Sequence, residues 1–192
     1  MRSSRRWILC TSLLLVVLSL AGCSEEPLSE QLTPTPLSLR MTQYENDQAF
    51  DLLYPSDWTY MIVQPGLILF GELKTVNQQE AGASLSVFRQ APEDFRGGLE
   101  GAYQHYLENG PLRSGFVAEG DVISTVLGGK EALQMMLERD ADGELPGAKA
   151  HIVAALSDSG QVYVLSATAP IEQWDEHWAS FQVSIGSFEF NE

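Results

Sequence analysis

Cysteine is nearly missing from this 192-residue sequence, and both copies lie within the first 23 residues. No cysteine follows Cys23, so residues 24–192 contain neither a disulfide nor a thiol nucleophile. Histidine is also scarce, and no two of the three copies, His105, His151 and His177, are three to five residues apart. Zinc sites usually contain such a local pair, so the sequence predicts solvated or packed histidines and no metal centre built on them.

A hydrophobic run long enough to cross a bilayer is missing as well. The apolar run near the start, Trp7–Leu20, carries no charge and has fourteen residues, whereas a membrane-spanning helix needs roughly 20. Three arginines precede this stretch, and the small residues Ala21 and Gly22 follow it. This order of positive, apolar and small segments is typical of an export signal and disfavours a permanent transmembrane helix.

The end of the signal resembles the bacterial lipobox. In that motif the cysteine receives a diacylglyceryl group, and a peptidase then cleaves the chain just before it; here the matching residues are Leu20-Ala21-Gly22-Cys23. The resemblance predicts that residues 1–22 are a lipoprotein signal peptide and that Cys23 is the lipidated residue, with fatty acyl chains such as palmitate as the membrane anchor. The alternative is a secretory signal without lipid that happens to contain a cysteine.

Positive charge is scarce in the rest of the chain. Removal of residues 1–22 would remove three arginines and no acidic residue, which leaves a formal net charge of −18. Such an acidic surface repels phosphate backbones and anionic lipid headgroups, so the composition argues against nucleic-acid binding and against a basic membrane-docking patch. The membrane affinity then has to come from the acyl anchor. The expected location is the extracytoplasmic face of the cell membrane or the outer membrane.

Composition divides the exported chain into two parts. Residues 23–40 contain the anchor cysteine followed by three prolines, three acidic residues and little apolar periodicity, which indicates a disordered acidic tether. Residues 41–192 are enough for one domain with a sizeable core.

The apolar pattern predicts an antiparallel sheet covered by helices. Tight turns separate two pairs of strand-like segments, one pair joined by Gly128-Gly129 and the other by Ser157–Gly160. Strands joined by tight turns pair antiparallel, which gives an α+β fold. The predicted strands lie in the segments 48–55, 66–73, 82–90, 121–127, 130–140, 150–156, 161–169 and 187–190.

Two amphipathic helices are expected. The first begins at Pro92 and carries one apolar stripe from Phe95 to Leu107, although three internal glycines weaken it. The second begins near Pro170 and places Trp174, Trp178 and Phe181 on one side. The spacing of these aromatic side chains favours a role in the core, with Trp178 central to it.

Three segments carry a resemblance to the PsbP family, which are exported proteins whose plant and cyanobacterial members sit on the lumenal side of photosystem II. The matching segments are "FDLLYPSDW", "AHIVAALSDSGQVYVLSATAP" and "WDEHWASFQVSIGSFEF". The resemblance implies an α/β/α sandwich over residues 41–192 and an assembly or accessory role. It also makes His151 the histidine most worth testing, since many relatives carry a histidine there. The acidic tether replaces the segment with which plant members bind the photosystem.

Local motifs for chemistry are few. No G-x-S-x-G elbow is present, and no cofactor is predicted. Asp140, Asp142 and Glu144 bring hard oxygens together beside Gly143, which suits calcium, but the spacing is not that of an EF-hand loop, so the pattern favours a polar hairpin turn over a calcium site.

The aromatic side chains leave a second alternative open. Trp58, Trp174 and Trp178 could form a ligand platform instead of part of the core.

These observations favour a non-catalytic, lipid-anchored binding module that contacts a membrane or envelope protein. The chain is therefore not expected to be an enzyme. The alternative function is a carrier of a small ligand or metal ion, or an enzyme whose site is assembled from residues distant in the sequence.

Overall fold

The computed structural model describes residues 39–46, 49–78, 80–91, 96–143 and 145–191, and these belong to one compact unit. The lipobox, Cys23 and nearly all of the tether lie outside the described residues. No helix in the described ranges is long and apolar enough to cross a membrane. The strands are β1 (Met41–Tyr44), β2 (Phe50–Pro55), β3 (Thr59–Gln64), β4 (Leu67–Gly71), β5 (Ser84–Gln90), β6 (Val117–Ala118), β7 (Ile123–Leu127), β8 (Lys130–Arg139), β9 (Ala148–Leu156), β10 (Val162–Pro170) and β11 (Glu189–Phe190).

The described strands form two sheets in which every pairing is antiparallel. The larger sheet has eight strands in the order β3-β4-β5-β10-β9-β8-β6, with β7 also paired to β8, and the smaller sheet has the order β1-β2-β11. Both predicted hairpins are present, and Gly128 and Gly129 hold the left-handed backbone that the first one needs. The expected α+β class with an antiparallel sheet is confirmed.

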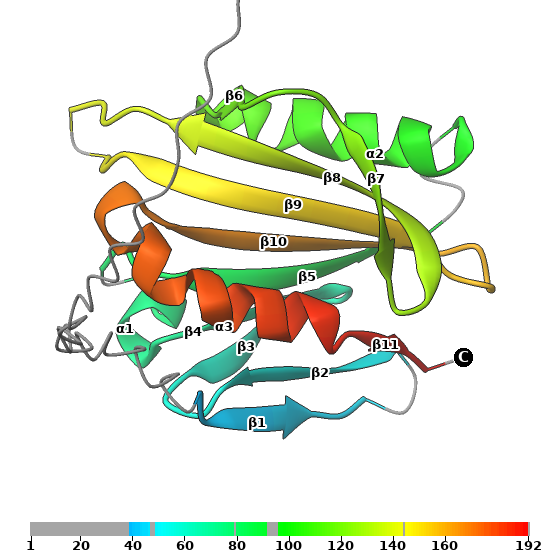
Figure 1. Cartoon of the computed structure of the whole chain (residues 1–192), viewed down its shortest axis with the longest axis horizontal. Helices are drawn as coiled ribbons and strands as arrows, with labels where there is room; N and C mark the ends of the chain where they lie inside the picture. Colours follow the sequence, from blue (N-terminus) through cyan, green and yellow to red (C-terminus); the bar gives the residue numbers. More distant parts are fainter. Residues whose placement is uncertain (1–38, 47–48, 79, 92–95, 144, 192) are drawn as a thin grey trace, which may run out of the picture. The chain divides into compact units, whose positions relative to one another are not determined.

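Three helices are described: α1 (Leu73–Val76), α2 (Gly98–Asn109) and α3 (Trp174–Gly186). Short 3₁₀ turns occupy Leu112–Ser114 and Ile171–Gln173, the latter just after Pro170. Helices α2 and α3 cover opposite faces of the large sheet, as Figure 1 shows, so the expected α/β/α sandwich is confirmed as well. The small sheet shares the α3 side.

The predicted start of α2 at Pro92 is wrong. Residues 92–95, including Phe95, lie outside the described residues, but Arg96 and Gly97 are not helical and α2 begins at Gly98. Gly97 and Gly98 have φ values of 93° and 66°, which a right-handed helix does not allow. The paired glycines therefore mark the helix start instead of lying in its interior.

The alternation of side chains along each strand builds two cores. On the α3 side, Val153, Leu165 and Leu85 pack with Phe181 and with the small sheet; on the α2 side, Ile152 and Val164 pack beneath Tyr103. The Tyr103 hydroxyl donates a hydrogen bond to the Ile152 carbonyl oxygen at 3.0 Å, and burial raises its pKa. Both cores use only residues from Tyr44 onward, so a fragment from Leu39 to Glu192 contains every residue of the described core.

Candidate functional site

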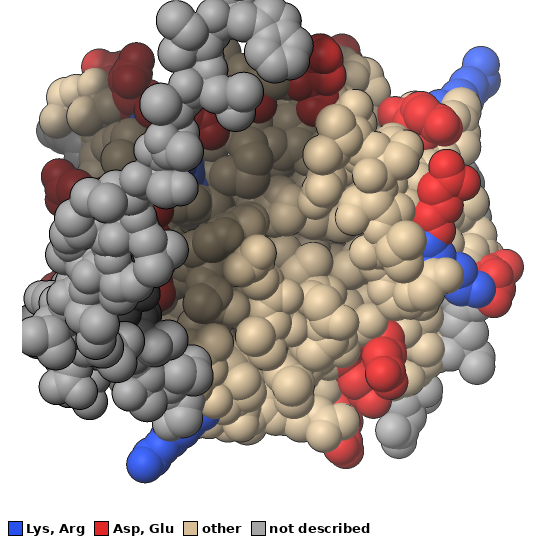
Figure 2. All heavy atoms as spheres, viewed as in Figure 1, with Lys and Arg blue, Asp and Glu red and all other residues tan. Residues whose placement is uncertain are grey.

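A groove of about 480 Å³ lies between α3 and the β8 side of the large sheet. Figure 2 shows this face of the molecule hollowed above α3, mostly uncharged, with acidic side chains at its margins. The turn of the β7–β8 hairpin lies close to β11, because Gly128 lies against Phe190. We call this hollow the His151 groove; its main lining residues are Ile123, Gln134, Met136, His151, Trp178 and Ile185.

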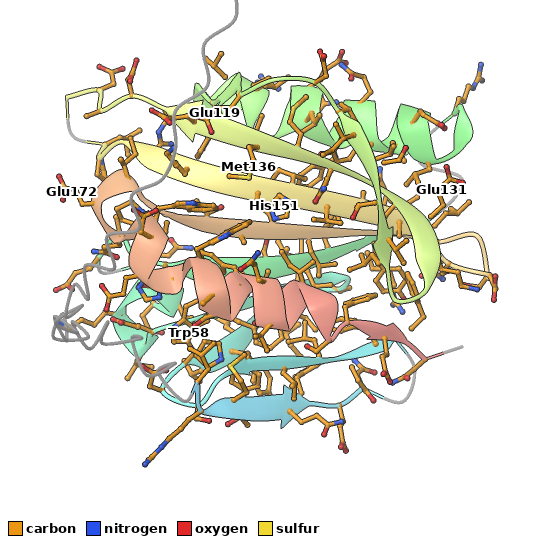
Figure 3. All side chains as sticks on the ribbon, viewed as in Figure 1. Trp58, Glu119, Glu131, Met136, His151 and Glu172 are labelled. Carbon is orange, nitrogen blue, oxygen red and sulfur yellow. The ribbon has the colours of Figure 1, made fainter. Side chains whose placement is uncertain are left out.

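Strand register brings the floor of the groove together. The pairing of β8 with β9 places Met136 directly opposite His151, and Figure 3 shows the two side chains next to each other above α3. The next residue of β9 on this face, Val153, is buried in the core beneath α3, whereas His151 lies where the helix no longer covers the sheet. The groove therefore continues the α3-side core into a part of the sheet that α3 does not cover.

The His151 ring is neutral, and its Nδ1 atom is a hydrogen-bond acceptor without a donor. Its side chain is only 9% exposed, and Nε2 lies 2.9 Å from Oε1 of Gln134. Because an amide oxygen only accepts, Nε2 carries the proton, and Nδ1 is then an acceptor that is buried without a hydrogen-bond partner. Burial lowers the pKa of His151, which favours this neutral form at pH 7.

Trp178 packs against the edge of the core and also forms the wall of the groove, so the expected core contact is present but the ring is only partly buried. Its indole is half-buried, stacks on Trp174 with ring centroids 5.3 Å apart, and meets the His151 ring edge-on at 5.4 Å. Trp58 and Trp174 are buried, as a core role requires. The three indoles do not form one open platform, since Figure 3 places Trp58 on the other side of α3 from His151.

The rim of the groove combines an exposed apolar side chain with acidic groups. Ile123 at the start of β7 is 55% exposed, and Glu119 and Asp121 line the same end of the groove. Lys149 lies 3.5 Å from Glu119 and 3.1 Å from Glu138, so its charge is shared between these two partners. The rim is therefore net acidic.

The other candidate residues are placed apart from this groove. His105 is exposed on α2, on the opposite face of the sheet, and the half-buried His177 ring contacts Trp58 and Phe181. Within the described ranges, no three His, Cys, Asp or Glu side chains gather as a metal site.

The calcium candidates lie in a loop at the end of β8. Asp140 and Asp142 are exposed, and the backbone of Asp142 forms a two-way bridge with Leu145 at 3.0 Å. Glu144 lies outside the described residues. The bridge fits the hairpin-turn interpretation, and calcium binding stays a prediction.

Sequence reasoning missed Gln134, Met136 and Ile123 as groove residues. A signal was available, because Leu133, Met135 and Leu137 were predicted to share one face of a strand, so Gln134 and Met136 had to share the other. The apolar pattern did not predict which strand pairs with β8, and so it did not predict which residue lies opposite Met136.

Among the described residues that line the His151 groove, none is a Ser, Thr, Cys or Lys that could act as a nucleophile. The groove contains apolar contact area, the aromatic rings of His151 and Trp178, and the buried acceptor Nδ1 of His151.

Comparisons with known proteins support the fold. No protein-family profile matches the sequence, and a search of curated proteins gives no match either. Among solved structures, the chain is similar to cyanobacterial PsbP (CyanoP) from Synechocystis sp. PCC 6803, with a TM-score of 0.53 and 18% identity over 79% of this chain and 93% of that one. It is also similar to the Ran-binding protein Mog1p of Saccharomyces cerevisiae, with a TM-score of 0.56 and 13% identity over 81% and 97%. The chain therefore has the α+β fold seen in PsbP and Mog1p.

Proposed function

We propose that this protein is a lipid-anchored extracytoplasmic binding module that holds a protein partner in the His151 groove. The observation that carries the proposal is the exposed Ile123 beside the half-buried Trp178, on a largely uncharged face. Contiguous apolar surface with an aromatic anchor is typical of a protein interface. Mog1p, which binds Ran, is an example of protein binding on this fold.

The chemistry of the groove selects one kind of partner segment. An apolar side chain of the partner fits against Trp178 and Met136, and Lys or Arg residues next to it pair with Glu119 and Asp121 at the rim. The net charge of −18 after signal removal would speed the approach of such a basic segment. Contacts of this kind weaken as ionic strength rises.

The same lining supports the proposed non-catalytic role. His151 could act as a base, but none of the described lining residues offers a nucleophile for it to activate. A reproducible hydrolytic turnover that is lost on His151→Gln would contradict the binding role and favour the enzyme.

The anchor is proposed at Cys23, on the extracytoplasmic face of the cell membrane or the outer membrane, because this cysteine ends an apolar run too short to span. Cys23→Ala should abolish incorporation of a fatty-acid analogue and leave unprocessed precursor in the cell. Unchanged labelling would exclude this cysteine as the anchor.

A pair of matched substitutions tests the groove. Ile123→Asp places a charge at the rim, whereas Ile62→Asp makes the same change on β3, at the opposite edge of the large sheet, where Ile62 is 64% exposed. Immobilised fragment 39–192 should retain a discrete envelope protein at low salt and release most of it at about 0.5 M salt. Ile123→Asp should reduce retention at least tenfold, and Ile62→Asp should leave it within twofold.

Equal loss in both variants would mean that retention depends on general surface apolarity and not on the groove. Retention that is insensitive to salt would contradict the acidic rim as a recognition element.

A further inference from the structure

A second hollow, of about 550 Å³, lies on the opposite face of the large sheet, between α2 and strands β4 and β5. The outward side chains of these strands, Leu67, Leu69 and Phe88, form its apolar wall, and Tyr106 of α2 faces them. The rings of Phe88 and Tyr106 are 6.0 Å apart and tilted by 32°. We call this hollow the Gln90 cavity, after the polar residue at the end of β5.

Gln90 is the polar group in this cavity that the fold leaves unpaired. Its side chain is 8% exposed, and its Oε1 atom is buried without a hydrogen-bond partner. A buried amide oxygen without a donor costs about 1–3 kcal/mol. Proteins rarely keep such a cost without a reason, and a ligand that supplies the donor is one reason.

The hydroxyl groups nearby do not meet that need. Ser86 and Tyr106 also line the cavity, but Gln90 Oε1 has no hydrogen-bond partner, so neither hydroxyl donates to it. Gln90 lines the cavity, and rotation about its last torsion, which has a broad energy minimum, is the motion that would present Oε1 to an occupant.

The residues that line the cavity also indicate the charge of a molecule that could bind there. Among the described residues that line the Gln90 cavity, none is an Asp, Glu, Lys or Arg. A charged ligand would lose its hydration without gaining a counter-charge. The volume is within the range of single small-molecule sites.

From these observations we infer that the Gln90 cavity binds a neutral, mainly apolar small molecule whose hydrogen-bond donor pairs with Gln90 Oε1. This site lies on the face opposite the His151 groove and does not depend on the protein partner proposed there. The two can therefore fail or succeed separately.

N-phenyl-1-naphthylamine is a suitable probe, because it is neutral and apolar, carries one N–H donor and fluoresces in apolar surroundings. Its N-methylated analogue has the same rings without the donor. Fragment 39–192 should bind the amine saturably with one-to-one stoichiometry. It should bind the N-methylated analogue about tenfold more weakly, the loss expected for one hydrogen bond to a buried acceptor.

Three variants test whether the probes bind in the Gln90 cavity. Gln90→Leu should abolish the difference between the two probes, and Leu69→Trp, which fills the cavity from β4, should abolish binding of both. Gln104→Leu makes the same Gln-to-Leu change at an exposed position of α2 outside the cavity and should leave both affinities within twofold. Circular dichroism of each variant establishes that the fold is retained.

Equal binding of the two probes by the unsubstituted fragment would overturn the inference without any variant. A tenfold preference that survives in Gln90→Leu would place the donor contact elsewhere and would overturn it too. The absence of saturable binding would mean that this cavity is not a small-molecule site.

Discussion

Trp178 and Phe181 lie one helical turn apart on α3 in different surroundings, which gives a direct test of where the core ends. Phe181 is fully buried, whereas Trp178 is half-buried at the groove. Phe181→Ala should lower the free energy of unfolding by about 3–5 kcal/mol, and Trp178→Ala by about 1–3 kcal/mol because part of its ring already contacts water. Urea denaturation of fragment 39–192 measures both, and equal losses would contradict the placement of Trp178 in the groove wall.

His151 should make stability depend on pH. Burial lowers its pKa in the folded chain, so the unfolded chain takes up the proton first as the pH falls below about 6.5. The contribution is fully present above that pH and is lost as the pH falls towards the folded pKa. The groups that face the ring are Gln134, Met136 and Trp178, and the carboxylates of Glu119 and Asp121 lie at the rim of the same groove.

The matched comparison for this prediction uses His151→Gln and His105→Gln. The loss of unfolding free energy between pH 7.5 and 5.5 should shrink in His151→Gln and persist in His105→Gln, since His105 is exposed. A decline of the same size in all three chains would show that other groups cause the pH dependence.

At the scale of elements, the β7–β8 turn packs against β11 through a close glycine contact. Gly128 has φ 55°, and a Cβ atom there would lie 2.7 Å from the Phe190 ring; Gly129 has φ 77° and nothing within 4 Å. Gly129→Ala should cost about 1 kcal/mol for the backbone alone, and Gly128→Ala at least about 1 kcal/mol more. If urea denaturation gave equal costs, the turn would not be packed on β11.

The elements also show what the sequence could predict. Alternation identified β2 and β8, because their inward and outward side chains differ in polarity, whereas the turn signal at Ser157–Gly160 identified β10, which is buried on both faces. Alternation missed β3, whose outward residues Tyr60 and Ile62 are apolar although exposed, so the strand carries no contrast between its faces. It also missed β1, whose residues are mostly exposed.

The groove was less predictable than the fold, because it depends on pairings between distant segments. His151 was singled out by the family resemblance, and Trp178 by its helical spacing. Their contact requires β9 to lie beside β8 and α3 to end its coverage at that edge. The local sequence pattern around His151 and Trp178 predicts neither condition.

At the scale of the whole molecule, charged and uncharged surface are separated on the face that Figure 2 shows. The face that contains the His151 groove is largely uncharged, while acidic groups lie at its margins (Figure 2). In the proposed interaction the acidic margin would attract and orient a basic partner, and the apolar groove would supply the desolvated contact. Lipidation at Cys23, as proposed, would keep the domain next to partners in the same membrane.

Site-specific photo-crosslinking in intact membranes tests the central claim, that the His151 groove holds a protein partner. A benzophenone amino acid at position 123 should give one discrete crosslinked product, and the same amino acid at position 62 should not. The crosslinked peptide, identified by mass spectrometry, should contain an apolar residue next to Lys or Arg. A product that forms equally from both positions, or only from position 62, would contradict the account.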